Sequence, residues 1–285
     1  MKKLAFSVVV PVYNAASSLM ESLHSIENQT YKPAELIIVN DGSTDASAAL
    51  IEAFIEKTAL KVVYLVQENK GLGAARNCGW QKAKSEWIAF LDADDLWFEN
   101  KLSELNNRIA KDSKSIYYHS MQALEGGRDR NAAEVNRIED LLLEGKSPIP
   151  SSVVIAKAIL QKHSGFIEDK AFLGVEDLHL WLRLIQAKET FIPIEMPLGK
   201  YRAGGMSSKL EAHSKRVEAV LDTLANSLKI SLLLYRQSKR RLKYERARAY
   251  HKEGGFRQAM SLYMQTMPNA KSLVFCFACF LRIRI

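Results

Sequence analysis

The sequence predicts an α/β protein with a mostly parallel β-sheet flanked by helices. Four short apolar runs rich in β-branched residues recur in the first hundred residues, at Phe6 to Val10, Leu36 to Val39, Val62 to Val66 and Trp87 to Leu91. The segments between them show helical spacing of apolar residues, and this alternation is typical of parallel sheets. The runs are apolar at nearly every position, as strands are when helices cover both faces of a sheet.

The first run is expected to be a strand and not a cleaved leader. Two lysines precede it, but Pro11 and Asn14 interrupt the apolar residues early and no small-residue cleavage site follows. Apolar residues at intervals of three and four then predict helices around Leu19 to Ile26 and Leu50 to Ile55, which separate the first three strands.

Charge divides the chain into two parts. Of the 285 residues, 47% are apolar and 25% are charged, which are ordinary globular values. Residues 200–285 carry 18 Lys or Arg against 5 Asp or Glu, whereas residues 1–199 carry 22 against 27. We expect one domain over residues 1–210, with halves at about 1–100 and 101–210, and a basic helical extension over residues 211–285.

The cysteines predict neither a disulfide framework nor a metal site. Cys78, Cys276 and Cys279 are few and unevenly placed, which suits a reducing compartment. Cys276 and Cys279 form a C-x-x-C pair inside the apolar stretch "LVFCFACFL", with no second pair or histidine cluster, so packed thiols are expected.

Each predicted strand ends in a polar cluster. The clusters read "PVYN" at 11–14, "NDGSTD" at 40–45, "ENKGLGAARN" at 68–77 and "DADD" at 92–95. One such cluster is ordinary turn chemistry. Four clusters at the carboxyl ends of parallel strands, where such sheets bind ligands, predict a functional site.

The three carboxylates at the end of the fourth strand indicate a missing positive charge. Burying unpaired like charges together is unfavourable. Asp92 and Asp94 point the same way if the extended chain continues, and hard oxygen ligands suit Mg²⁺ or Mn²⁺, which complete their shells with water and phosphates. The cluster therefore predicts a metal and a bound diphosphate.

These motifs resemble the family 2 glycosyltransferases, nucleotide-sugar enzymes of the GT-A fold. The resemblance spans Phe6 to Ser208 and rests on "VVVPVYN", "LIIVNDGSTD", "NKGLGAARN", "FLDADDLWFENKL" and "GVEDLHLWLRL" in that order. It implies an inverting, metal-dependent hexosyl- or N-acetylhexosaminyl-transferase. The implied donor is a UDP-sugar, with dTDP left open, and the acceptor is a hydroxyl of a glycan or lipid-linked glycan in cell-surface polysaccharide biosynthesis.

The resemblance also implies roles for residues of the donor site. In the family the first two clusters hold the base, which assigns Pro11, Tyr13, Asn14 and Asp41 to a uracil-type pocket, with Asp41 accepting from the ring N–H. Gly71 and Arg76 would lie along the nucleotide, and Arg76 would approach the diphosphate or order the loop. Asp92, with Ala93 beside it, would contact the ribose, and Asp94 is the expected ligand of Mn²⁺ or Mg²⁺.

An acidic pair begins the last motif. Glu176 and Asp177 precede a helical apolar stripe, where the helix dipole alone favours acidic residues. The resemblance makes Asp177 the expected general base, and Glu176 a neighbour that orients the acceptor or a loop amide.

The segment "KYRAGGMSSK" departs from the family pattern, because Gly204 stands where many relatives have a metal- or diphosphate-binding histidine. Arg202 and Ser207 are then candidates for diphosphate contact. The Gly204-Gly205 pair suits the hinge of a lid.

Other binding functions are less well supported. "GLGAAR" has Arg76 at the third glycine position of a dinucleotide fingerprint and follows the third strand, so NAD and FAD are not expected. The basic region lacks an aromatic RNA-binding strand or zinc spacing, so no nucleic acid is expected. A non-catalytic nucleotide-sugar or membrane-binding protein of the same fold stays as the alternative.

The last apolar stretch predicts contact with a membrane surface or packing as a final helix. Nine apolar residues, Leu273 to Leu281, form a helix of ~14 Å, too short for a hydrocarbon core of ~30 Å. With the nearby basic residues it suits an anionic membrane surface. We expect a cytoplasmic protein at the inner face of the cell membrane; the sugar, the acceptor, the linkage and the oligomeric state stay open.

Overall fold

The computed structural model describes residues 3–109, 115–203, 210–266 and 270–283. Contacts within the chain define two compact units: unit 1 comprises residues 1–138 and 146–203, and unit 2 comprises residues 139–145 and 204–285. The division falls after Ala203, a few residues before the expected boundary at 210, and the short segment 139–145 groups with the C-terminal helices.

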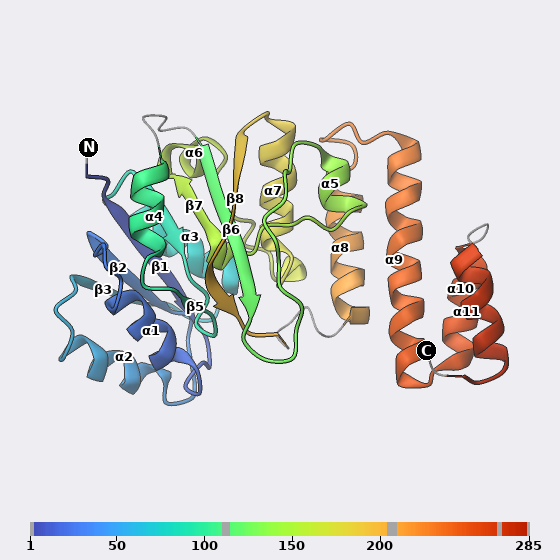
Figure 1. The fold of residues 1–285 in the computed structure, drawn as a ribbon, viewed down its shortest axis with the longest axis horizontal. Coiled ribbons are helices and arrows are strands. Elements are labelled where there is room, and N and C mark those ends of the chain that lie inside the picture. Colours follow the sequence, from blue (N-terminus) through green and yellow to red (C-terminus); the bar gives the residue numbers. More distant parts are fainter. Residues whose placement is uncertain (1–2, 110–114, 204–209, 267–269, 284–285) are drawn as a thin grey trace. The chain divides into compact units, whose positions relative to one another are not determined.

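Unit 1 contains one mixed sheet, and its described residues form eight strands in the order β3-β2-β1-β4-β7-β6-β8-β5 (Figure 1). The strands are β1 (Phe6–Val12), β2 (Glu35–Asn40), β3 (Val62–Val66), β4 (Trp87–Phe90), β5 (Leu96–Trp97), β6 (Ser115–Ala123), β7 (Val153–Ala156) and β8 (Thr190–Tyr201). The first four strands are mutually parallel, as predicted. Strand β7 runs antiparallel to both β4 and β6, and the short β5 runs antiparallel to β8.

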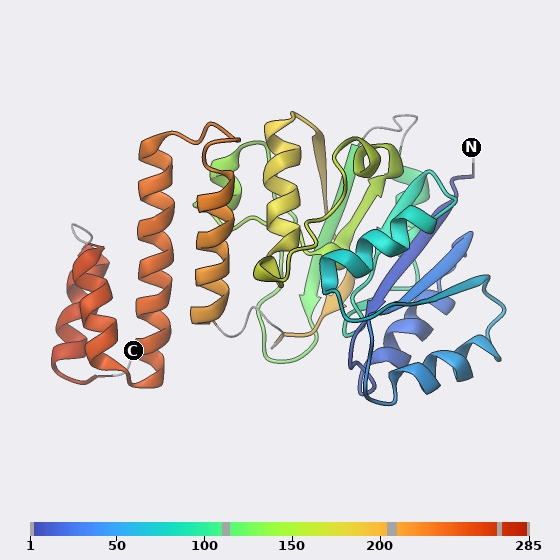
Figure 2. The same ribbon diagram turned by 180° about the vertical axis from the view of Figure 1, so that it is seen from behind.

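Helices cover both faces of this sheet. The helices are α1 (Leu19–Glu27), α2 (Ser47–Ile55), α3 (Leu72–Lys82), α4 (Lys101–Arg108), α6 (Lys157–Lys162) and α7 (Glu176–Gln186), with short 3₁₀ turns at Pro150–Ser152 and Lys170–Phe172. Helices α1 and α2 lie on the face seen in Figure 1, and α3 and α7 lie on the face seen in Figure 2. Every residue of β1, β2 and β4 is buried, which explains why their sequences are apolar except at Ser7, Glu35 and Asn40.

Two glycines let α3 approach its neighbours closely. A Cβ atom at Gly79 would overlap a methyl group of Val9 on β1, and one at Gly73 would overlap the carbonyl oxygen of Ile167. Only glycine therefore allows α3 to lie so close to the sheet and to the segment that precedes α7.

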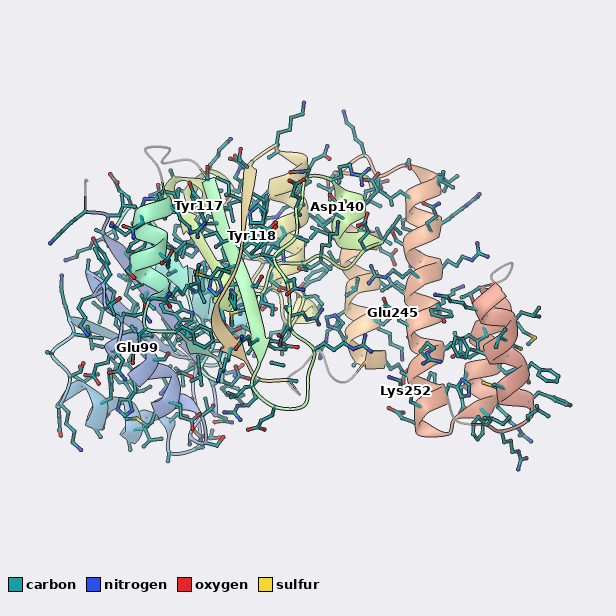
Figure 3. All side chains as sticks on the ribbon, in the orientation of Figure 1. Glu99, Tyr117, Tyr118, Asp140, Glu245 and Lys252 are labelled. Carbon is teal, nitrogen blue, oxygen red and sulfur yellow. The ribbon has the colours of Figure 1, made fainter. Side chains whose placement is uncertain are left out.

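Unit 2 is helical in its described residues. Its helices are α8 (Leu210–Leu224), α9 (Leu232–Glu253), α10 (Phe256–Gln265) and α11 (Ala270–Phe280), and most of α5 (Ile138–Leu142) belongs to it. Figure 3 labels Glu245 and Lys252 on α9. The left-handed Gly254 ends α9 and reverses the chain into α10. In the described part of the chain, no helix combines the length and the apolar character that crossing a membrane requires.

Candidate functional site

The predicted site residues gather at one edge of the sheet in unit 1. Because β1 is parallel to both β2 and β4, the loops that follow these strands leave the sheet at the same edge. Tyr13 and Asn14 follow β1, Asp41 follows β2, and Asp92 lies two residues after β4.

The loops after β1 and β2 are joined by hydrogen bonds through Asn14. Its side-chain oxygen accepts from the Thr44 amide at 2.7 Å, and its own amide donates to Ser43 Oγ at 3.1 Å. Asn14 adopts a left-handed backbone conformation, with φ of 49°, which asparagine tolerates better than most residues. Its neighbour Tyr13 is 52% exposed and makes its ring available at this edge, whereas Pro11 is buried within β1.

Asp41 organises the loop that leads into α3. The residue is buried, and its carboxylate accepts hydrogen bonds from Gln67 Nε2 at 2.7 Å and from the amides of Lys70 and Gly71 at 2.8 Å each. Gly71 has a φ of 95° and stands immediately before the first residue of α3. A carboxylate has about four acceptor positions, so three internal bonds leave room for about one ligand donor.

Arg76 connects the acidic loop after β4 with the start of α7. Its guanidinium lies 2.7 Å from Asp92 Oδ1 and 2.6 Å from Glu176 Oε1, and the side chain is only 1% exposed. Burial by itself lowers the pKa of Arg76, but Asp92 and Glu176 together raise it above its ordinary value, so the cation stays charged. The sequence interpretation allowed Arg76 to approach a diphosphate or to order a loop; in the structure its two terminal nitrogens are used by these carboxylates.

The acidic loop contains three carboxylates in different surroundings. Asp92 pairs with Arg76, whereas Asp94 forms no ion pair within the described residues, and burial followed by the charge of Asp92 raises its pKa. Asp95 is buried, and burial together with the charges of Asp92 and Asp94 raises its pKa to about 8. The Ala93 carbonyl faces inward and accepts from Ser18 Oγ at 2.9 Å.

Residues outside the predicted site hold the acidic loop in place. Ser151 Oγ accepts from the Asp92 amide at 3.0 Å, while its carbonyl accepts from Trp97 Nε1 and Lys101 Nζ, both at 2.8 Å. The Lys101 ammonium also lies 3.6 Å from the centroid of the Trp97 ring. Burial lowers the pKa of Lys101, and Asp95 partly offsets this. A lysine at a helix start is usually solvated, so the sequence carries no signal for this role.

Glu176 and Asp177 are the first two residues of α7, as the pattern predicted. Glu176 is buried, and its second oxygen accepts from the Gly174 amide at 2.6 Å. Asp177 is half-buried and forms no ion pair with any described residue. Burial, and then the charge of Glu176, raise the pKa of Asp177 to about 7, while Arg76 partly opposes them.

Arg202 reaches the acidic loop through its backbone. Its amide donates to Asp95 Oδ1 at 2.9 Å, while its guanidinium pairs with Glu125 at 2.9 Å and Glu21 at 3.2 Å. The guanidinium is therefore engaged by exposed carboxylates in this structure. Ser207, the Gly204-Gly205 pair and the histidine position at Gly204 lie outside the described residues.

The acidic loop fits a divalent cation that is only partly held by protein. In the described ranges, no three His, Cys, Asp or Glu side chains lie close enough together to hold a metal ion by themselves. Asp94 is nevertheless a half-buried carboxylate with no ion-pair partner among the described residues, and a cation would lower its raised pKa. One or two carboxylates with substrate phosphates are the usual ligands of protein-bound Mg²⁺.

Comparison with known proteins identifies the family. The family described as "Glycosyl transferase family 2" matches residues 7–167, so the chain belongs to this family. An amylovoran biosynthesis glycosyltransferase, AmsB of Erwinia amylovora, is 30% identical over 214 residues, which are 70% of this chain and 70% of that protein. The glycosyltransferase GlyA of Streptococcus pneumoniae is 41% identical over 42% of this chain but only 18% of its own length.

Solved structures confirm the predicted GT-A fold. The structure of S. aureus TarS, residues 1–349, in complex with UDP-GlcNAc has a TM-score of 0.65 at 18% identity, covering 98% of this chain and 88% of that one. The mannosyltransferase PcManGT from Pyrobaculum calidifontis, in complex with GDP-Man and Mn²⁺, has a TM-score of 0.66 at 17% identity, covering 99% and 81%. The chain spans less than a fifth of the length of two curated relatives that it matches.

Proposed function

We propose that this protein is an inverting glycosyltransferase that transfers a sugar from a UDP-sugar to a hydroxyl of a glycan or lipid-linked acceptor. The single observation that supports it best is the Arg76 bridge. By binding Asp92 and Glu176 at once, Arg76 brings together a carboxylate loop suited to a metal diphosphate and a helix start suited to a base. Family membership supports the same reaction class.

The donor end is assigned to the loops after β1, β2 and β4. Tyr13 supplies an exposed ring, and Asp41 keeps about one free acceptor position for a base N–H. Asp92, held by Arg76 and Ser151, is assigned to the ribose. UDP is proposed as the nucleotide because TarS is described with UDP-GlcNAc; PcManGT is described with GDP-Man, so the base must be tested.

Asp94 would hold Mn²⁺ or Mg²⁺, and the charge of Asp92 acts on its carboxylate. A bound cation would neutralise the charge that develops on the departing diphosphate. The Mn²⁺ in the PcManGT complex supports this assignment, and the unpaired carboxylate of Asp94 is the feature of this chain that suits it.

Asp177 is assigned as the general base. As the acceptor oxygen forms its bond to the anomeric carbon, the nucleotide leaves from the opposite face with the electron pair of the breaking bond, and the hydroxyl proton moves to the Asp177 carboxylate. A base whose pKa is about 7 is well matched to this transfer near neutral pH. Glu176, fixed by Arg76 and the Gly174 amide, orients the helix start on which Asp177 lies.

The acceptor side is proposed more broadly. The relative from Erwinia amylovora is described as a biosynthetic glycosyltransferase, which supports a role in building a glycan, and cell-surface polysaccharide is the proposed product class. Gly204, at the position where many relatives have histidine, supports the second candidate, a non-catalytic nucleotide-sugar-binding protein of the same fold.

Titration calorimetry with UDP, dTDP, GDP and NAD, each with and without Mn²⁺, tests the donor assignment. The wild type, Asp94→Asn and the control Asp222→Asn, which changes a carboxylate of unit 2, are compared. We expect UDP to bind best, with an affinity that needs Mn²⁺ and is lost only in Asp94→Asn. UDP binding that is unchanged by Mn²⁺ and by Asp94→Asn would reject the metal assignment.

Single-turnover assays with the same proteins then separate the two candidate functions. Donor binding together with sugar transfer to a glycan acceptor supports the transferase. Donor binding without transfer to any of a panel of glycan and lipid-linked acceptors favours the non-catalytic protein.

A further inference from the structure

We propose that one face of α11 binds an anionic lipid surface. This face, called the α11 face, consists of four exposed helix residues and two exposed residues that follow the helix: Leu273, Val274, Phe277, Phe280, Leu281 and Ile283. The four helix residues are 61% to 72% exposed. Scattered exposed apolar residues are common in soluble proteins, but a continuous stripe of large ones indicates an interaction surface.

The spacing of these residues places them on one side of the helix. Leu273 precedes Phe277 by four residues and Phe277 precedes Phe280 by three, which are the intervals that bring helical side chains together. The other side of α11 is packed: Cys279 is buried in a core with Ala259 and Tyr263, and Phe275 packs against that core. The α11 face is therefore a second apolar side of the helix, separate from the side that packs in the core of unit 2.

The packed side fixes the orientation of α11 within unit 2. Phe275 stacks on Tyr263 with ring centroids 5.7 Å apart, and the Arg248 guanidinium lies 4.2 Å from the centroid of the Phe275 ring. After the end of α11, the Ile283 carbonyl accepts a hydrogen bond from Nε2 of the buried His251 at 2.7 Å. These contacts hold α11 so that its apolar face points to solvent.

Charge identifies an anionic lipid surface as the partner. Residues 254–285 contain four cations, Arg257, Lys271, Arg282 and Arg284, and no aspartate or glutamate. Lys271 and Arg282 are exposed at the two ends of α11. A cation near an anionic leaflet strengthens binding about fivefold, whereas a second copy of this surface would bring like charges together.

The size of α11 suits binding in the plane of the interface. Its 11 residues extend about 16 Å, roughly half of the hydrocarbon core of a bilayer, so the helix is too short to cross. Exposed apolar and aromatic side chains with flanking cations bind at the boundary between headgroups and acyl chains, so α11 would insert its exposed face there while its other side stays packed in the core of unit 2. This inference does not depend on the proposed sugar transfer, and its test uses no turnover.

The test is sedimentation of the full chain with vesicles of phosphatidylcholine alone or mixed with phosphatidylglycerol. Phe277→Ser/Phe280→Ser removes the two largest residues of the α11 face, and Leu232→Ser/Leu233→Ser is the matched control, because these α9 leucines are 62% and 67% exposed. We expect binding to the anionic vesicles only. It should weaken about tenfold or more in the phenylalanine variant, stay unchanged in the control, and weaken about fivefold in Arg282→Ala.

Three results would overturn the proposal. They are failure of the wild type to bind anionic vesicles, equal binding by the phenylalanine variant, and equal binding to neutral vesicles. Light scattering is measured in parallel, because a dimer that the phenylalanine variant abolishes would assign the face to a protein partner. Circular dichroism and UDP titration of each variant confirm its fold and keep the result separate from the donor assignment.

Discussion

Arg76 is the residue on which the acidic site depends. It is buried, and its single positive charge is shared between one carboxylate from the loop after β4 and one from α7. A buried cation is costly to desolvate, but removing it from an established pair costs more, because the partners stay buried without a counter-charge.

Replacing Arg76 by Gln should lower the free energy of unfolding by about 3–5 kcal/mol, because Asp92 and Glu176 then lose their shared partner. Urea unfolding measures the change. Arg108→Gln is the control: Arg108 is 46% exposed and lies 3.5 Å from Glu104, and an exposed pair of this kind contributes about 1 kcal/mol or less. Equal losses of unfolding free energy in the two variants would mean that the buried Arg76 ion pairs stabilise the protein no more than an exposed pair does.

Asp177→Asn should reduce kcat by about 10²- to 10⁴-fold and leave UDP affinity unchanged, since the lost group acts on the acceptor proton. The conservative change keeps the size of the side chain. We would measure kcat by steady-state assay and the Kd of UDP by calorimetry, for the wild type and for the variant. A fall in UDP affinity equal to the fall in kcat would move Asp177 to the donor site.

The pH dependence of kcat gives a second test of Asp177. Burial and then Glu176 raise its pKa to about 7, and only the deprotonated carboxylate accepts a proton. Activity should therefore rise as pH increases through about 7 and then reach a plateau. A fall in kcat only near the ordinary pKa of aspartate, or no fall at low pH, would contradict the assigned role.

At the scale of elements, the position of α3 depends on glycine. A Cβ at Gly73 would overlap the Ile167 carbonyl, and α3 carries Arg76 one turn later. The tight packing of one helix thus positions the cation that joins the acidic loop to α7.

Gly73→Ala should destabilise unit 1 by about 1–3 kcal/mol, even though alanine favours a helix by about 1 kcal/mol over glycine. The clash is with backbone, which cannot move aside as a flexible side chain does. Thermal unfolding measures the effect, and Gln81→Ala, at an exposed position of α3, should change stability by less than about 0.5 kcal/mol. A stabilised Gly73→Ala protein would show that α3 can shift without cost.

At the scale of the whole molecule, the two units can be followed separately. All four tryptophans, Trp80, Trp87, Trp97 and Trp181, belong to unit 1, whereas both units contain helices. Tryptophan fluorescence therefore reports the unfolding of unit 1, and far-ultraviolet circular dichroism reports both units.

Saturating UDP and Mn²⁺ should raise the fluorescence midpoint of thermal unfolding and leave a second, dichroism-detected transition in place. A ligand at 100 times its Kd stabilises the unit that binds it by about 2.7 kcal/mol. The reason is that the proposed donor residues lie in unit 1. Coincident transitions that shift together would show instead that the two units unfold cooperatively.

Strands and helices of the nucleotide-side half were predictable because their signals are local. Runs that are apolar at nearly every position predicted β1 to β4, and helical spacing predicted α1, α2 and the start of α7 at Glu176. The sequence did not indicate that segment 139–145 belongs to unit 2. The segment lies within the stretch of chain that forms unit 1 but groups with the helices of unit 2. Packing of this kind depends on distant residues, and no local pattern encodes it.

The sequence by itself determined the family, the mostly parallel sheet and the clustering of polar motifs at its carboxyl edge, because strand direction and motif order follow from the chain. Only the tertiary structure decided which charges meet. Arg76 and Glu176 are separated by 100 positions in the chain, yet their side chains lie 2.6 Å apart. Lys101, Ser151 and the α11 face likewise acquire their roles through burial and exposure, which depend on packing between distant segments and not on residue type.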